Sequence, residues 1–341
     1  MTEKQYGGAT SFGLKDNFPK NLEKNLSPIK NILNENMKNE KNNFSYFTNE
    51  EIEKLKKAGR ISSQAREFAR SLIKPNMPLL EIAEKIESKI IELGGKPAFP
   101  VNLSINEIAA HSTPSFNDSQ KAFGLLKVDL GVHIDGYIAD TAFSLSLEEN
   151  EENKKLIEAA EKALKNAIEK FSLGLPLKEI GKEVERTITS FGFVPIANLS
   201  GHSIIPWILH SGINIPNVSN SSPLELEEGV YAIEPFSTSG FGSVKEGKPS
   251  GIYNLEKESK VRDLFARNIL QYIKEEYRTL PFCSRWLVKK FGSRALIALQ
   301  RLEEAKIIHQ YPQLIESGKG KVAQAEHTLI LTNKEKIVST I

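Results

Sequence analysis

The chain has 341 residues, enough for one large domain or two ordinary domains with a sizeable core. Its 45 lysines and arginines nearly balance 43 acidic residues, and the formal net charge of +2 argues against a dedicated nucleic-acid-binding protein. The single cysteine, Cys283, allows no internal disulfide, and its apolar surroundings favour a small buried side chain over a nucleophile. No apolar run approaches the roughly 18 residues of a membrane span. We therefore predict a cytoplasmic protein with no secretory signal and no membrane contact.

Residues 1–47 are rich in asparagine and lysine and contain few large apolar residues. Such a segment cannot bury enough surface to offset its ordering entropy, so we predict a disordered extension. Thr48 and Glu51 then form the capping-box pattern at the start of a helix, which Pro75 ends. The folded part is therefore predicted to span residues 48–341.

An internal repeat follows. Residues 77–82 (MPLLEI) resemble residues 175–180 (LPLKEI) at an offset of 98, and Gly94 and Gly192 match at the same offset. Both copies predict a helix that begins at a proline, is closed by glycine and leads into an extended segment. The repeat suggests a pseudo-twofold α/β domain whose halves face each other across a cleft.

Between the two copies, residues 125–133 and 137–145 are apolar runs joined by Asp135-Gly136, which predicts a β-hairpin. This turn makes Asp129 and Asp140 diagonal neighbours on one face of the hairpin. Two carboxylates among apolar strand residues repel each other and resist desolvation, and a divalent cation between them removes both penalties. An exposed hairpin with two solvated aspartates is the alternative at this point.

Three more residues have side chains suited to a metal site. Glu234 and Glu326 interrupt other apolar strand patterns, and His202 follows a glycine. With the two aspartates they form a set suited to two hard or borderline divalent metals and unlike a thiolate-rich zinc site. Histidines near apolar segments are more often structural, as we expect for His133 and His309.

Several motifs together resemble methionine aminopeptidases, in order and spacing, across residues 48–341. The matching segments are residues 98–107 with His111, residues 127–131 and 138–142, Gly201-His202, residues 209–212, residues 233–235 and residues 326–328. The resemblance implies the pseudo-symmetric α/β "pita-bread" fold.

The resemblance also implies site residues and a cofactor of two divalent metal ions. Asp129 would bind one ion, Asp140 and Glu326 would bridge both, and His202 and Glu234 would complete the second. His111 and His210 would contact the substrate near the scissile amide, and Phe99 would line the pocket for the methionine side chain. The ligand set suits Co, Mn, Fe(II) or Zn and does not identify the metal.

The long spacing between Glu234 and Glu326 points to the type II branch of this family. Type II members carry a helical, winged-helix-like insertion there, which we predict at residues 256–321; residues 279–282 and 285–287 look like its signature. The eight-residue step from His202 to His210 also fits type II. Residues 203–207 are more apolar than expected, and Pro206 is expected to affect the cleft rim.

The implied activity is removal of the N-terminal methionine from nascent polypeptides by a monomer. A dimetal-activated hydroxide would attack the first peptide bond, with Glu234 as proton acceptor, His210 stabilising the oxyanion and His111 orienting the substrate amide.

Two alternatives remain open. A prolidase-like or aminopeptidase P-like proline peptidase would share the fold and ligands but lacks the long insertion. A non-catalytic relative kept for ribosome or RNA binding typically loses ligands. The insertion carries 14 lysines and arginines against 8 acidic residues, an excess that could make a transient ribosome contact or simply cover solvated helix faces.

Overall fold

The computed structural model describes residues 46–341, so the extension predicted at residues 1–47 lies almost entirely outside the described residues. The helices are α2 (Asn49–Leu72), α3 (Leu79–Glu92), α4 (Glu151–Lys170), α5 (Leu177–Ser190), α6 (Leu264–Glu276), α7 (Ser284–Phe291) and α8 (Ala295–Glu304). The strands are β1 (Lys96–Pro97), β2 (Asn102–Ile105), β3 (Ile108–Ala110), β4 (Leu125–Ile134), β5 (Tyr137–Ser146), β6 (Val194–Pro195), β7 (Ser200–Ile204), β8 (Asn214–Pro216), β9 (Gly229–Ile233), β10 (Phe236–Thr238), β11 (Val244–Leu255), β12 (Phe282–Cys283), β13 (Ile308–Glu316), β14 (Val322–Gln324), β15 (Glu326–Leu331) and β16 (Lys336–Val338). In this range no helix combines the length and apolar content that a membrane span requires.

The first described helix, α2, begins at the predicted capping box. The Glu51 backbone N–H donates to the Thr48 hydroxyl at 3.3 Å, and the Thr48 backbone N–H donates to the Glu51 carboxylate at 2.8 Å. The two contacts satisfy donors that a helix start otherwise leaves unpaired. The capping-box prediction is confirmed.

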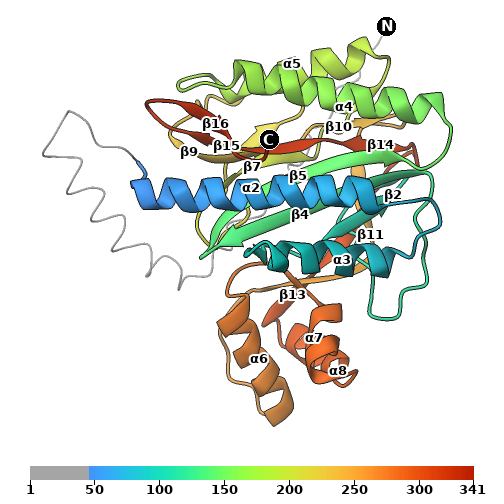
Figure 1. Cartoon of the computed structure of the whole chain (residues 1–341), viewed down its shortest axis with the longest axis vertical. Coiled ribbons are helices and arrows are strands. Elements are labelled where there is room, and N and C mark those ends of the chain that lie inside the picture. Colours follow the sequence, from blue (N-terminus) through green and yellow to red (C-terminus); the bar gives the residue numbers. More distant parts are fainter. Residues whose placement is uncertain (1–45) are drawn as a thin grey trace, which may run out of the picture. The chain divides into compact units, whose positions relative to one another are not determined.

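The central sheet has the strand order β1-β4-β5-β15-β9-β7-β8, with β2 joined to β4 and β16 to β15. Figure 1 shows the long strands β4 and β5 side by side. The predicted hairpin is formed by β4 and β5, and Gly131 lies opposite Asp140 in its register. Asp135 and Gly136 have φ angles of 51° and 89°, as a two-residue hairpin turn of type I′ requires. The hairpin and its register are confirmed.

The two faces of this sheet differ in chemistry. The even-numbered residues of β4 from Leu126 to Val132 pack in one core with α2 and α3. In β9 and β15, Tyr231, Ile233 and Leu329 pack in a second core with α4 and α5. Because neighbouring residues of a strand point to opposite faces, the alternate residues, including Asp129, lie on the face away from these helices.

The predicted repeat is present in three dimensions. Helices α3 and α5 begin and end at the same offset of 98, as do strands β1 and β6. Pro78 and Pro176 precede the two helices with nearly identical backbone angles, and Gly94 and Gly192 follow them with φ angles of 84° and 83°. The α2–α3 pair and the α4–α5 pair each cover part of the central sheet (Figure 1). The pseudo-twofold prediction is confirmed.

Between Glu234 and Glu326 the chain forms a separate cluster of elements. Helices α6, α7 and α8 pack around their own core, which includes residues of β11, β12 and β13. Strand β13 lies inside the segment predicted as a helical insertion and pairs with β11 and β3, so the insertion also contains strands. Cys283 is buried there, and burial raises the pKa of its thiol to about 12, which agrees with a packing role. The boundaries 256 and 321 stay a prediction.

A buried ion pair joins this insertion to α3. Arg285 of α7 donates from Nη1 and Nη2 to the two carboxylate oxygens of Glu87, at 2.6 and 2.7 Å. The Trp286 indole N–H adds a hydrogen bond of 2.9 Å to Glu87, and Arg285 Nε donates to the Pro114 carbonyl at 3.1 Å. The signature segment seen in the sequence therefore fixes the insertion on the rest of the domain.

We predict that Arg285→Ala lowers the free energy of unfolding by about 3–5 kcal/mol, because the Glu87 carboxylate is left buried without its cation. Urea unfolding followed by circular dichroism measures the change. Lys289→Ala is the matched control, since Lys289 links the same two helices through an exposed pair with Glu84 at 3.4 Å. The control should change stability by no more than about 0.5 kcal/mol; equal losses in the two variants would contradict the prediction.

Candidate metal centre

Five neighbouring strands of the central sheet bring the candidate ligands together. Asp129 lies on β4, Asp140 on β5, Glu326 on β15, Glu234 directly after β9, and His202 on β7. These strands are adjacent in the sheet, although the residues span nearly 200 positions of the chain. Strand pairing alone therefore collects the five side chains on one patch.

The distances within this patch fit shared metal ions. His202 Nε2 lies 3.7 Å from Asp140 Oδ2 and 3.7 Å from Glu234 Oε1. A carboxylate oxygen of Asp140, an imidazole nitrogen of His202 and a carboxylate oxygen of Glu326 all lie within 4.8 Å of one another. Metal–ligand bonds of roughly 2.0–2.2 Å place two ligands of one ion at most about 4.4 Å apart, so small side-chain adjustments complete such a site.

Burial makes this concentration of charge costly. Asp140 and Glu326 are 3% and 1% exposed. Burial raises the pKa of Asp129 to about 7, and burial with neighbouring carboxylates raises the pKa values of Asp140 and Glu326 well above the usual range. The pKa of Glu234 is raised well above its usual range for the same reasons. A divalent cation reverses this balance, because it stabilises the ionised carboxylates.

His202 has the complementary property. Burial lowers the pKa of its imidazole to about 4, so the ring is neutral at pH 7. A neutral imidazole is the form that coordinates metals.

Three buried oxygens support the fit of metal ions to these residues. Asp129 Oδ1, Asp140 Oδ1 and Glu326 Oε2 have no hydrogen-bond donor within residues 46–341. Buried polar atoms are nearly always paired, so oxygens that converge without donors indicate a bound cation. Carboxylates with one imidazole suit a divalent metal, and the residues therefore fit the group.

A residue that the sequence interpretation missed, Gln324, links two of the carboxylates. Its Nε2 amide lies 3.5 Å from Asp129 Oδ2 and 3.4 Å from Glu234 Oε2, donating to both. Gln324 stands two positions before Glu326, a spacing that could have placed it on the same face. The neutral amide therefore orients the carboxylates of Asp129 and Glu234 without adding charge to the site.

The hydroxyl of Thr328 sets the register beside Asp140. It accepts a hydrogen bond from the Asp140 backbone N–H at 2.7 Å and donates to the Asp140 carbonyl at 2.8 Å. Thr141 in turn donates to the Glu326 carbonyl at 2.9 Å. These contacts hold the backbones of two carboxylate-bearing strands at a fixed spacing.

The predicted substrate histidines lie beside the carboxylates. The imidazole centroids of His210 and His202 are 4.2 Å apart, at an interplanar angle of 74°. The His210 side chain reaches solvent. The protein atoms around it nevertheless limit the hydration of the imidazole and lower its pKa well below 6.5, and the neighbouring imidazoles of His202 and His111 lower this pKa further. His210 is therefore a neutral, accessible ring at the edge of the centre.

His111 sits in a constrained backbone position. Its φ angle is 57°, and its Nδ1 lies 3.3 Å from the Pro312 carbonyl oxygen. Burial lowers its pKa, which favours the neutral ring. The ring of Tyr311, which the sequence interpretation also missed, lies beside it at a centroid distance of 5.4 Å. Tyr311 reaches this place because β13 pairs with β3, a contact that no local sequence pattern indicates.

Phe99, which the sequence predicts to line the substrate pocket, lies beside the β4–β5 hairpin. The ring is 5% exposed and packs against Gly131, where a Cβ would come within 2.3 Å of it. Phe99 shares a core with Ile204, two positions after His202, and with Leu209, directly before His210. An apolar wall therefore borders the carboxylate patch.

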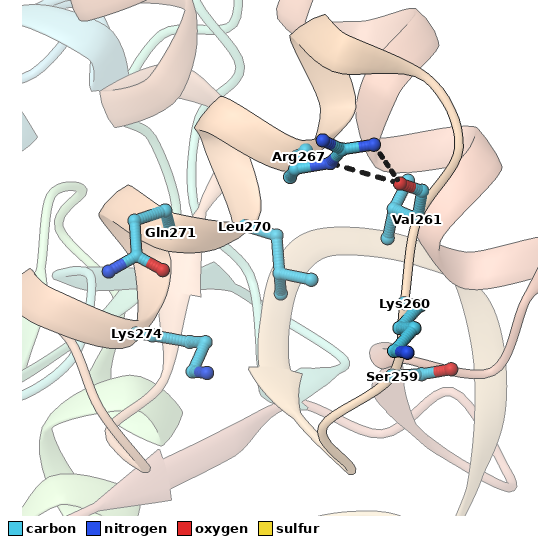
Figure 2. A pocket seen from close by; sticks show the side chains of 7 residues that line it. All are labelled: Ser259, Lys260, Val261, Arg267, Leu270, Gln271 and Lys274. Atoms are coloured by element: carbon cyan, nitrogen blue, oxygen red, sulfur yellow. Dashed lines mark hydrogen bonds between the residues drawn. The ribbon is translucent and has the colours of Figure 1, made fainter.

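A groove of about 420 Å³ lies elsewhere, on the insertion (Figure 2). Its lining residues are Ser259, Lys260, Val261, Arg267, Leu270, Gln271 and Lys274. The Arg267 guanidinium donates two hydrogen bonds to the backbone carbonyl of Val261, at 3.1 and 3.0 Å. No candidate ligand contributes to this groove, so we place the chemistry at the carboxylate patch.

Comparison with known proteins identifies the family. The model of metallopeptidase family M24 matches residues 53–333. The chain belongs to this family. It is 48% identical over 295 residues to the methionine aminopeptidase of Pyrococcus abyssi, which covers 85% of this chain and 99% of that protein.

Solved structures show that the fold is the M24 fold. A methionine aminopeptidase from Thermotoga maritima matches with a TM-score of 0.64 at 21% identity, covering 86% of this chain and 98% of that one. A prolidase from Pyrococcus furiosus matches with a TM-score of 0.56 at 20% identity, covering 86% of this chain and 64% of that one. The predicted α/β pita-bread fold is confirmed, and divalent metal binding follows from the family and the buried acidic group.

We predict that Gln324→Leu lowers the affinity for divalent metal by about 10- to 100-fold, because the amide no longer orients Asp129 and Glu234. Isothermal titration of the metal-stripped protein with Mn²⁺ measures the affinity. Gln300→Leu, the same change on the exposed side of α8, is the control and should leave it unchanged. An unaltered affinity in Gln324→Leu would show that the amide does not support the centre.

The raised carboxylate pKa values predict a pH-dependent stabilisation by metal. The folded, metal-free protein holds protons on these carboxylates that the unfolded chain has released above about pH 6, so its stability falls as pH rises through about 7. Bound metal replaces those protons. The difference in Tm between metal-loaded and metal-stripped protein should therefore increase from pH 6.5 to 8.5, as differential scanning calorimetry can measure. A constant difference, or one that shrinks, would refute the assignment of buried carboxylates as the ligands.

Proposed function

We propose that this chain is a metal-dependent aminopeptidase that removes the N-terminal methionine from nascent proteins. The observation that carries the proposal is the convergence of two aspartates, two glutamates and one histidine from five neighbouring strands. The 48% identity to a methionine aminopeptidase over 99% of that protein's length supports the substrate.

Within this proposal the centre holds two divalent ions. Asp129 would contribute to one ion, His202 and Glu234 to the other, and Asp140 and Glu326 to both. Four carboxylates and one imidazole offer more ligand atoms than one ion needs, which favours a pair. Co, Mn, Fe(II) and Zn all suit these ligands. When bound, a metal pair lowers the pKa of water toward about 7 and polarises the substrate carbonyl.

The protein's own side chains orient the substrate and move the proton. Glu234 accepts the proton of the attacking water, because a bound cation keeps its carboxylate ionised and so able to take up a proton. His210 hydrogen-bonds to the oxygen on which charge develops, and His111 hydrogen-bonds to the scissile amide. Both rings favour the neutral state, in which one nitrogen donates and the other accepts. Phe99 lines the pocket for the methionine side chain.

Two alternatives are less well supported. The match to a prolidase is at 20% identity and extends to the fold alone. A non-catalytic relative has no need for buried, mutually repelling carboxylates, and all five ligand positions are filled here.

The partners follow from the substrate. Because nascent chains are the proposed substrate, we expect the enzyme to act in the cytoplasm and as a monomer. A transient ribosome contact through the basic insertion stays a prediction, and several of the insertion's cations are already paired, as in Arg301 with Asp263 and Lys274 with Glu258.

We predict that Asp140→Asn and Glu326→Gln each abolish metal binding and hydrolysis together, because each removes a bridging carboxylate without changing volume. Metal content by mass spectrometry and release of methionine from Met-Ala-Ser are the two measurements. Asp135→Asn is the matched control, since Asp135 lies at the exposed hairpin turn with φ 51°, which asparagine tolerates. Full turnover in either ligand variant would rule out the assignment.

The same assay separates the proposed substrate from the proline-directed one. Metal-stripped protein, reloaded in turn with Co²⁺, Mn²⁺, Fe²⁺ and Zn²⁺, is tested on Met-Ala-Ser and on a dipeptide with proline in second place. Cleavage of the first substrate supports the proposal. Cleavage of the proline dipeptide alone would favour a prolidase-like activity.

A further inference from the structure

The segment between the two site histidines forms an unusual turn. Ile205 and Ile208 exchange two backbone hydrogen bonds, of 3.1 and 2.9 Å, with Pro206 and Trp207 at the corners. Trp207 has a φ angle of 67°. A turn with proline at its second position and a positive φ at its third normally carries glycine or asparagine there, because a side chain is strained in that conformation. Contacts outside the turn must therefore hold the tryptophan in place.

The first of these contacts is with the β4–β5 hairpin, which carries Asp129 and Asp140. The Trp207 backbone N–H donates to the Gly136 carbonyl at 2.9 Å. The indole covers Gly136 so closely that a Cβ at that glycine would come within 2.2 Å of Nε1. The imidazole of His133 packs on the indole at a centroid distance of 5.0 Å.

The second set of contacts comes from the insertion. The Arg278 guanidinium lies 4.1 Å from the centroid of the Trp207 ring, and the Thr279 hydroxyl donates to the Trp207 carbonyl. Leu280, which is 2% exposed, packs in the same core as Leu209 and Phe99. Trp207 is thus held between the hairpin turn and the segment that connects α6 to β12.

The base of the loop is also tied. The Ser211 backbone N–H donates to the Ser203 carbonyl at 2.8 Å, and the two hydroxyls are 2.6 Å apart. His210 therefore stands between two fixed points, the Ser203–Ser211 pair and the Trp207 turn. Its own imidazole reaches solvent, with an aromatic contact to His202. The direction of the His210 ring then depends on where Trp207 fixes the turn.

We propose that Trp207 is a positioning residue that sets the orientation of His210 and through which the insertion acts on the metal centre. The inference rests on the proposed function, since it concerns His210 as a substrate-binding group. It predicts that the insertion affects hydrolysis without contributing a metal ligand. Arg278 and Thr279 are the residues that transmit this effect.

The test uses the full chain loaded with Mn²⁺ and the substrate Met-Ala-Ser. Trp207→Gly removes the indole and suits the positive φ, whereas Trp207→Phe keeps an aromatic ring. Trp207→Gly should lower kcat about 100-fold, as expected for a catalytic group displaced by about 1 Å. Its Mn²⁺ affinity should stay within about 2-fold of the wild type, because no ligand changes. Trp207→Phe should retain most of the wild-type kcat. Arg278→Ala should also lower kcat, but by less than Trp207→Gly does.

A double-mutant cycle with His210→Asn separates positioning from a general structural role. If Trp207 acts through His210, adding Trp207→Gly to His210→Asn causes little further loss of kcat. A loss in the double variant equal to the product of the two single losses would overturn the proposal. So would a full kcat in Trp207→Gly, or a loss explained by weaker Mn²⁺ binding.

A spectroscopic readout keeps this proposal distinct from the proposed function. In long-range ¹H–¹⁵N NMR spectra of the protein loaded with diamagnetic Zn²⁺, Trp207→Gly should shift or broaden the imidazole signals of His210 and leave those of His309 unchanged. If the wild type fails to cleave Met-Ala-Ser, the proposed function fails, and these signals still decide the role of Trp207. Unchanged His210 signals would refute it.

Discussion

The constraint on which the structure depends is the repulsion among four carboxylates on one buried face of the central sheet. Asp140 and Glu326 are almost fully buried, and the pKa values of all four acidic groups are raised. In an apolar interior such a group is strongly destabilising unless a cation or protons neutralise it. The helices on the other face, the Gln324 amide and the Thr328 register contacts make the patch rigid enough to keep this charge in place. The metal-free protein is therefore less stable than it would be without the four buried carboxylates that form the metal site.

The local features of this design were predictable from sequence because they depend on short-range patterns. The Asp135-Gly136 turn fixed the register of Asp129 and Asp140, and the repeat at offset 98 correctly indicated two similar halves. The carboxylates themselves stood out because charged residues rarely interrupt apolar strands. What remained hidden depends on contacts between distant segments: Tyr311 reaches His111 through the pairing of β13 with β3, and Gln324 carries no charge to draw attention.

The contacts between the insertion and the rest of the domain were also not predictable from sequence. The sequence of the insertion showed helical segments and a recognisable signature, but not how those residues contact the domain. Arg285 uses a buried bidentate pair with Glu87 of α3, and Arg278 packs on Trp207 beside the hairpin turn. Apolar residues 204 and 205 and the pair Pro206-Trp207 looked in sequence like a departure at the cleft rim. In the structure the indole of Trp207 fills the junction between hairpin and insertion, which gives a physical reason for that apolar character.

The charged groups of the centre and its two outer histidines lie in different parts of the structure. Carboxylates and the imidazole of His202 lie within the sheet, where strand pairing fixes them; His111 and His210 lie outside the regular strands, in segments with constrained backbones. Neutral imidazoles suit their place, because a second positive charge beside divalent cations would be repelled, whereas a neutral ring can donate to an oxyanion or an amide. In the proposed enzyme the sheet would therefore hold the cations, and shorter segments that contact the insertion would orient the groups proposed to contact the substrate. Under the proposal for Trp207, changes in the insertion would alter hydrolysis, whereas metal binding would depend on the sheet.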